Sequence, residues 1–192
     1  GAVGARHRPL LAAPALPAAS GSRWATGEAA SEEARWQQGR QVLEHIKTGD
    51  EDLAIELLPT ADLAATDDFG STALILAARA GLGGLCQELL VQPGVDVNAQ
   101  NHFGSTPLIC AATNGHLDVC ELLLQRSADV HRRTRLGGTA LGKAAASGRE
   151  PVCRRLLAAG ATLDVRTKLG ESASDLARKA GHADLAQLLE GA

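Results

Sequence analysis

Two kinds of short apolar segment alternate along residues 67–192, separated by polar turns that contain glycine. The first kind is rich in alanine, as at Ala144-Ala145-Ala146, and the second carries adjacent leucines, as at Leu122-Leu123. Each segment has the length of a short helix, and a glycine directly after such a segment is a common helix stop. The pattern therefore predicts pairs of short helices that pack through small side chains, with a turn after each helix.

Two series of glycines show that the pattern is a repeat. The first series is Gly70, Gly104, Gly137 and Gly170, and the second is Gly81, Gly115, Gly148 and Gly181. Both series advance by 34, 33 and 33 residues, and the extra residue falls in the interval that holds the turn Gln92-Pro93-Gly94. A fixed period of this length indicates a stack of similar supersecondary units.

Signals for the start of a helix recur at one place in each unit. Short hydroxyl side chains, which suit the N-cap position, stand at Thr72, Thr106, Thr139 and Ser172. Pro107 occupies the first helical position of its unit, where its missing N–H costs nothing. From Thr106 to Val130 the chain continues with T-P-L, G-H and A-D-V, and with the period of 33 it resembles the ankyrin repeat over about residues 67 to 192.

The resemblance implies an all-α ankyrin-repeat solenoid, made of stacked helix-turn-helix units with finger loops and capped at both ends. A degenerate first unit with a helix at about 32–47 is expected, because residues 49–58 align with residues 81–90. The last unit has polar groups where the others are apolar, as a terminal cap requires. The expected domains are an extended arm at 1–33 and a repeat domain at 34–192, with units at 34–66, 67–100, 101–133, 134–166 and 167–192.

The chain departs from the family at the position after T-P-L, where histidine is usual. That position holds Ile75, Ile109, Gly142 and Asp175. Hydrogen bonds that this histidine supports between neighbouring repeats are therefore expected to be missing, which would make the stack less stable.

The first 27 residues differ in composition from the rest. They contain three arginines and no acidic residue, among many alanines, prolines and serines. This composition resembles an organelle transit peptide or its remnant. The alternatives are a flexible linker and an arm that docks on a larger complex.

The four cysteines fit a structural role better than a metal site or a disulfide. Cys86, Cys120 and Cys153 occupy the same position of three successive second helices, and Cys110 lies in a first helix. Cysteine in such places is usually a small buried apolar residue. We expect four reduced thiols and hence an intracellular, reducing compartment, namely the cytoplasm or nucleus, or the mitochondrial matrix or chloroplast if the N-terminus is a transit peptide.

No catalytic or cofactor motif accompanies the repeats. The G-x-G-x-x-G and P-loop patterns are absent, and His116 and His182 follow turn glycines, where the family often has histidine for turn geometry. We therefore expect neither enzymatic activity, nor a cofactor, nor a metal. No apolar run approaches the roughly 18 residues of a membrane-spanning helix.

Charge is unevenly spread. Residues 28–70 hold 11 acidic and 3 basic residues, whereas residues 126–168 hold 10 basic and 3 acidic residues. Basic fingers raise nucleic-acid binding as an alternative function, but such binding favours aromatic residues interleaved with the basic ones. Both phenylalanines lie outside the basic segment, so a partner protein is the preferred interpretation.

The family binds partner proteins on a concave face built from finger tips and first helices. Carried onto this sequence, the partner-binding residues are Asp68, Phe69, Arg79, His102, Phe103, Asn114, Arg133, Arg135, Leu136, Arg166, Lys168 and Leu169. Phe69, Phe103, Leu136 and Leu169 would form an apolar stripe on this face, or would pack on the neighbouring fingers. Asn98, in the sequence Asp96-Val97-Asn98, resembles asparagines that are hydroxylated in many animal ankyrin repeats, and the alternative is a structural turn residue.

Overall fold

A computed structural model describes residues 27–191, which form ten helices joined by short connections. The bounds are α1 Gly27–Thr48, α2 Glu51–Leu57, α3 Ala73–Ala80, α4 Gly83–Leu89, α5 Pro107–Asn114, α6 Leu117–Gln125, α7 Ala140–Ala146, α8 Glu150–Ala158, α9 Ala173–Lys179 and α10 Ala183–Glu190. Within the described part no β-strand occurs, and the only β-pairing is one isolated bridge between Thr66 and Thr72.

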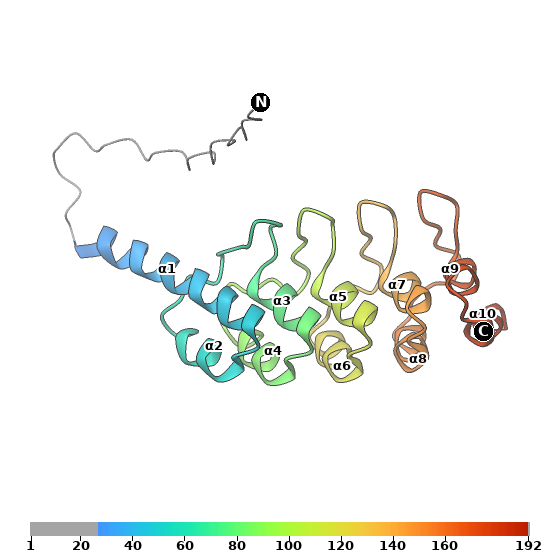
Figure 1. Cartoon of the computed structure of the whole chain (residues 1–192), viewed down its shortest axis with the longest axis horizontal. Coiled ribbons are helices and arrows are strands. Elements are labelled where there is room, and N and C mark those ends of the chain that lie inside the picture. The colour runs from blue at the N-terminus through green and yellow to red at the C-terminus, as the bar shows by residue number, and fades with distance from the viewer. Residues whose placement is uncertain (1–26, 192) are drawn as a thin grey trace, which may run out of the picture.

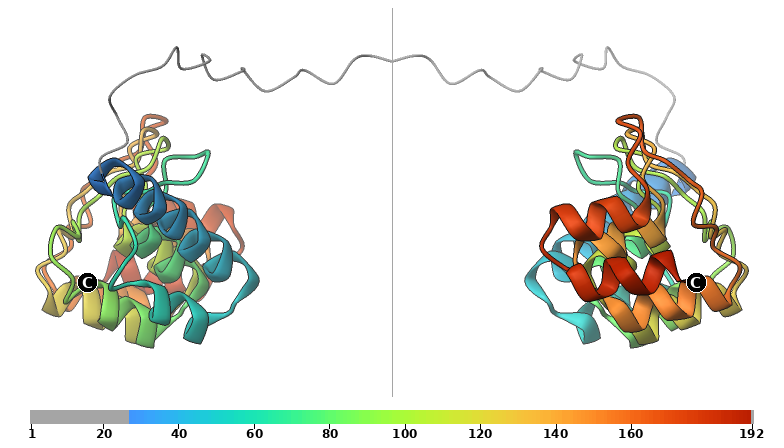
Figure 2. Two further views of the ribbon diagram at one scale, coloured as in Figure 1. Left: turned by 90° about the vertical axis from the view of Figure 1, so that its left-hand side faces the viewer. Right: turned by 90° about the vertical axis from the view of Figure 1, so that its right-hand side faces the viewer.

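The helices form two layers. The odd-numbered helices pack side by side in one layer, the even-numbered helices form the second, and four long loops project beyond the first layer (Figure 1). The end views show that these loops all lie on the same side of the stack (Figure 2). The expected all-α repeat solenoid is confirmed.

Local chemistry explains where the first helices begin and end. The hydroxyl of Thr106 accepts a hydrogen bond from the amide of Ile109 (3.2 Å), and Pro107 is the first helical residue of α5. Equivalent caps start α3, α7 and α9. Gly115 ends α5 in the left-handed conformation with φ of 87°, which a residue with a Cβ adopts at a steric cost.

Small and medium side chains fill the space between the layers. The three central second helices each bury one Leu or Val, one Cys and one Leu. The sets are Leu85, Cys86 and Leu89 in α4, Val119, Cys120 and Leu123 in α6, and Val152, Cys153 and Leu156 in α8. Alanines of α3, α5 and α7 cover them from the other layer. The prediction that Cys86, Cys120 and Cys153 are buried apolar residues is confirmed.

The N-terminal unit differs most from the expectation. Helix α1 begins at Gly27 and therefore includes residues 27–33, which were expected in the extended arm. Its first turns contain Glu28, Ala29 and Ala30, which favour helix. Helix α1 packs on α2 and α3 and closes this end of the stack. The expectations for residues 1–26 lie outside the described residues.

Among residues 27–191, none of the helices combines the length and the apolar character needed to cross a lipid bilayer.

Candidate functional site

Four projecting loops, here called fingers 1 to 4, span residues 66–72, 100–106, 133–139 and 166–172. Each is a tight turn stabilised by a polar residue at its second position. In finger 2 the side chain of Asn101 accepts hydrogen bonds from the amides of Phe103 and Ser105, both at 3.0 Å. Asp67 and Thr167 accept the equivalent pair of bonds in fingers 1 and 4, and Thr134 in finger 3 accepts one, from the amide of Gly138 (3.0 Å). This geometry places the residue two positions after the polar residue, such as Phe103, at the finger tip.

Neighbouring fingers are joined through the backbone. Fingers 1 to 3 each accept one hydrogen bond from a backbone amide of the next finger, and the pairs are His102 to Phe69 (2.9 Å), Arg135 to Phe103 (2.9 Å) and Lys168 to Leu136 (3.0 Å). The approach is so close that a Cβ on Gly104 would lie 2.9 Å from the amide nitrogen of Arg135. These bonds do not involve the position after T-P-L, so the fingers are linked despite the missing histidine.

Two of the arginines expected to bind a partner instead bind the stack itself. Arg133 donates to the carbonyl oxygens of Gly137 (3.2 Å) and Arg166, and Gln100 occupies the same place one repeat earlier, donating to Gly104 (2.8 Å) and Arg133 (3.1 Å). Arg166 donates to Gly170 (2.8 Å). The structure thus gives Arg133 and Arg166 an internal role, because their position in the finger faces backbone carbonyls.

The aromatic residues form a pair on the fingers. The rings of Phe69 and Phe103 lie 5.9 Å apart between centroids and are tilted by 35°, which is a favourable aromatic geometry. Both rings also face solvent, with exposed fractions of 54% and 57%, and Leu136 and Leu169 are exposed to 70% and 81%. The phenylalanine pair is therefore both packed and accessible, which combines the two interpretations, whereas the two leucines are mostly exposed.

Two hollows lie between the fingers and the first helices, a surface that we call the finger face. The larger, groove A, has a volume of about 420 Å³ and is lined by Phe69, Ser71, Arg79, Asn101, Phe103, Ser105, Ile109, Cys110, Thr113, Asn114 and Lys143. The smaller, pocket B, has a volume of about 220 Å³ and is lined by Thr134, Leu136, Gly138, Lys143, Ala146, Thr167, Lys168, Leu169, Glu171 and Leu176.

Seven of the twelve expected partner-binding residues line these hollows. Groove A gathers Phe69, Arg79, Phe103 and Asn114, and pocket B gathers Leu136, Lys168 and Leu169. The other five are Asp68, His102, Arg133, Arg135 and Arg166, and they lie at the fingers without lining either hollow. His102 packs its ring against Gly70 of the preceding finger.

Two lining residues were absent from the expected site. Cys110 is half-buried and not fully buried as expected, because its side of α5 lines groove A. Lys143 lines both hollows. Lys143 lies four residues after its N-cap, and the equivalent residues of the other first helices are Leu76, Cys110 and Leu176. A lysine at a position that is otherwise apolar was the sequence signal that could have identified Lys143 as a site residue.

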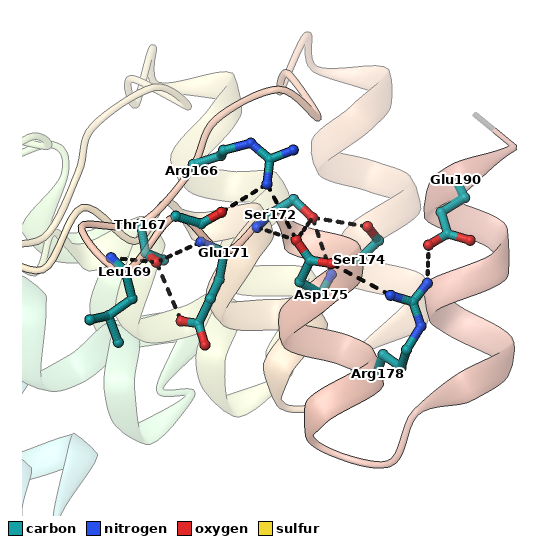
Figure 3. A network of polar contacts seen from close by, with 10 residues as sticks. Arg166, Thr167, Leu169, Glu171, Ser172, Ser174, Asp175, Arg178 and Glu190 are labelled. Carbon is teal, nitrogen blue, oxygen red and sulfur yellow. Dashed lines mark hydrogen bonds and ion pairs between the residues drawn. The ribbon is translucent and has the colours of Figure 1, made fainter.

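A polar network covers the last repeat (Figure 3). Asp175 completes a capping box with Ser172 and also contacts Arg166 (3.4 Å) and Arg178 (3.5 Å). Hydrogen bonds from the Ser172 side chain and backbone, together with the two arginines, hold the pKa of Asp175 below its ordinary value. Glu171 pairs with Lys179 at 2.8 Å, and this hydrogen bond lowers the pKa of Glu171.

Asn98 and His116 make bonds between repeats away from the finger face. The side-chain oxygen of Asn98 accepts a hydrogen bond from the amide of Asp129 (2.8 Å), as a structural turn residue would. The ring of His116 lies over Gly81 and hydrogen-bonds to the carbonyl of Arg79 (3.2 Å), consistent with its expected role in turn geometry.

The thiols are held in their protonated form. Burial raises the pKa of Cys86, Cys120 and Cys153 to about 12, and burial raises that of Cys110 to about 11. A protonated thiol is a poor nucleophile and a poor metal ligand. Within residues 27–191 there is no group of three or more histidine, cysteine or carboxylate side chains that could hold a metal ion.

Comparison with known proteins places the chain in a family. A family model described as ankyrin repeats (3 copies) matches residues 43–134. This range runs from the first helix pair to the third finger, and residues beyond it continue the same helix pairs and fingers through α10. No curated protein sequence matches the chain at a significant level. The matched repeats and the helical stack together show that the chain is an ankyrin repeat protein.

Proposed function

We propose that the chain is a non-catalytic adaptor or accessory subunit that binds a partner protein on its finger face. Ankyrin repeats are generally protein–protein interaction modules and are typically non-catalytic. The observation that carries the proposal is the Phe69–Phe103 pair, more than half exposed beside groove A. Large aromatic side chains at the centre of a groove are the usual anchors of an interface.

Photo-crosslinking from single positions tests this proposal. Replacing Phe103 with benzoylphenylalanine places a crosslinker on the finger face, and the same replacement at Glu88 places it on the exposed side of α4 in the other layer. In an extract from the native source, we expect a protein to be crosslinked from position 103 and not from position 88. Crosslinking from position 88 alone would move the binding surface to the second helices.

Nucleic acid is the alternative that the basic fingers raise. The backbone amide of Arg135 donates a hydrogen bond to the carbonyl of Phe103 (2.9 Å), so a basic residue and an aromatic residue are neighbours on adjacent fingers. Binding of homopolymer RNA that weakens steeply with salt, and is lost in the variant Arg135→Ala, would support this alternative. RNA binding that does not change in this variant would argue against the fingers as its site.

A further inference from the structure

The three central first helices contribute only positive charge to the finger face. Helices α3, α5 and α7 together contain two cationic side chains, Arg79 and Lys143, and no acidic side chain. Both cations line groove A. The charge of the chain as a whole is −3, so this surface differs in sign from the average of the molecule. Such local charge favours a partner of opposite sign.

Lys143 lies where a partner would pass from one hollow to the other. It lines groove A on one side and pocket B on the other. Its side chain runs beside Gly138, where a Cβ would come within 3.3 Å of the Lys143 Cε atom. The equivalent finger position is Ser71, Ser105 or Glu171 in the other repeats, so the glycine leaves room for the lysine stem.

Within residues 32–191, where side chains are described, Lys143 has no ion pair or side-chain hydrogen bond. Among the described residues that line the two hollows, Glu171 is the one carboxylate, and it pairs with Lys179 at 2.8 Å. Lys168, on the rim of pocket B, likewise has no ion pair in the described part of the chain. Lys143 and Lys168 therefore both border pocket B, and neither ammonium group forms an ion pair with the described residues.

Pocket B itself suits an apolar side chain. Its surface is mainly apolar, and Leu136, Leu169, Leu176 and Ala146 are among the residues that line it. A cavity of about 150 Å³ accommodates a benzene ring, and pocket B is larger, at about 220 Å³. It can therefore accept a leucine or phenylalanine side chain, while Lys143 and Lys168 remain at its edge.

Building on the proposed function, we propose that the partner segment is an acidic peptide with apolar anchors. A carboxylate of the segment binds Lys143, an adjacent leucine or phenylalanine enters pocket B, and a second apolar residue lies against Phe103 in groove A. The combination distinguishes a peptide from RNA. Phosphates could bind the lysines, but a pocket walled by leucines offers no aromatic platform on which a base could stack.

A peptide library displayed on phage tests the class of partner. A random 16-residue library is selected on the full chain, and the best peptide is then synthesised together with a form in which its acidic residues are amides. Affinities are measured by fluorescence anisotropy for the wild type, Lys143→Glu and Arg154→Glu. Arg154 is the matched control, since it makes the same charge change on α8, in the layer away from the finger face.

We expect selected sequences rich in Asp or Glu next to Leu, Ile or Phe. Lys143→Glu and the amide form of the peptide should each weaken binding at least tenfold, whereas Arg154→Glu should change it less than twofold. Lys143→Met keeps the side-chain stem and should also weaken binding, which separates loss of charge from a folding defect. A thermal melt of each variant checks that it is folded.

The contrary results separate this inference from the proposed function. Neutral or basic peptides that lose affinity in Phe103→Ala would overturn the acidic class and leave the finger face as the binding surface. Acidic peptides whose binding is unchanged in both Lys143→Glu and Phe103→Ala would overturn both statements. Selection of no peptide, or tighter binding of homopolymer RNA than of any selected peptide, would also overturn the inference.

Discussion

The guanidinium group of Arg133 donates a hydrogen bond to the main-chain carbonyl of Arg166 in the next finger. A second hydrogen bond joins it to Gly137 in its own finger, at 3.2 Å. Arg135, two residues later, makes no side-chain hydrogen bond or ion pair within the described residues. The two arginines of finger 3 thus have different environments, so replacing Arg133 and replacing Arg135 should affect stability and binding differently.

Arg133→Ala should lower the free energy of unfolding by about 1 kcal/mol, because carbonyls in two fingers lose a donor. Arg135→Ala should change it by less than about 0.5 kcal/mol, as is usual for an exposed side chain. Urea unfolding of both variants measures the difference. Arg133→Gln is the matched control, since Gln100 makes the same pair of bonds one repeat earlier, and it should retain most of the stability.

Arg135→Ala should instead act on binding. A free cation at the edge of an interface steers association more than it holds the complex, so the association rate should fall while the dissociation rate stays nearly constant. The effect should fade at high salt, which screens exposed charges. Surface plasmon resonance at two salt concentrations measures both rates. A change confined to the dissociation rate would contradict this role.

The difference between these arginines shows what the sequence could and could not reveal. The period of 33, the N-cap hydroxyls and the turn glycines depend on local spacing, and they were sufficient to predict the fold. The function of a finger side chain depends on which carbonyls lie within reach in the next repeat, 33 residues away. Arg133 and Arg135 look alike in the sequence, because both are basic residues of one finger.

For Lys143, by contrast, the sequence did contain a signal. Its helix is rich in alanine, so it resembles an ordinary solvated lysine when that helix is read alone. Alignment of the four first helices places it at a position that is otherwise Leu or Cys, which is a signal for an inward-facing charge.

The start of α1 was mispredicted for a different reason. The acid-free composition that defined the arm ends at Gly27, several residues before the boundary assigned to the arm.

Asn98 has a measurable structural role. Asn98→Ala removes the acceptor of the Asp129 amide, so we expect it to cost about 1 kcal/mol in the free energy of unfolding. Asn98→Asp keeps an acceptor oxygen and should cost less. Whether Asn98 is also hydroxylated can be read by mass spectrometry of the peptide from the native source. One added oxygen on Asn98 would confirm the modification. An unmodified Asn98 would mean that the residue has only its structural role in the turn.

The thiols should differ in reactivity. Only Cys110 is partly accessible, since Cys86, Cys120 and Cys153 are fully buried. In the native protein a thiol reagent should therefore label Cys110 first, and Cys110→Ser should remove this early phase. Denatured without reductant, the chain should show four free thiols, because cysteines on successive parallel helices are about 10 Å apart and a disulfide needs less than about 7 Å between Cα atoms. Recovery of two or none would contradict this.

Alkaline pH should destabilise the fold through the buried cysteines. Burial raises the pKa of Cys86, Cys120 and Cys153 from 9.0 to about 12. Between these values the unfolded chain loses thiol protons that the native chain retains, so the free energy of unfolding falls as the pH rises. The limiting slope is about 1.4 kcal/mol per pH unit for each thiol.

The measurement is a series of urea titrations between pH 8 and 10.5. The triple variant with alanine at the three positions will be less stable at every pH, because it leaves cavities in the core. Its stability should nevertheless decline less steeply with pH than that of the wild type. Lysine titration affects both proteins equally, so it does not obscure the comparison. Parallel slopes would show that the thiols are not the groups responsible.

Alanine variants of Phe103 and Leu123 should distinguish an effect on binding from an effect on folding. Leu123 is fully buried in α6, so Leu123→Ala should open a cavity and cost about 2–5 kcal/mol in the free energy of unfolding. Phe103→Ala removes an exposed ring and one aromatic pair, and the pair contributes only about 0.5–1.5 kcal/mol beyond its buried area. We therefore expect a small loss of stability at position 103 and a large one at position 123.

Partner affinity should show the reverse order, with a large loss in Phe103→Ala and little loss in Leu123→Ala. A side chain anchored at the centre of an interface contributes about 2 kcal/mol or more when it is truncated, so Phe103→Ala should weaken partner affinity roughly thirtyfold. Phe103→Leu retains apolar volume but not the tilted contact with Phe69, and it should lie between alanine and the wild type. Leu123→Ala, measured well below its melting temperature, should bind normally, because α6 lies in the layer behind the finger face. If Phe103→Ala instead unfolds the protein and leaves affinity intact, the ring belongs to the core of the fingers. The partner would then have to bind another surface, and the exposed side of the second helices would be the next candidate.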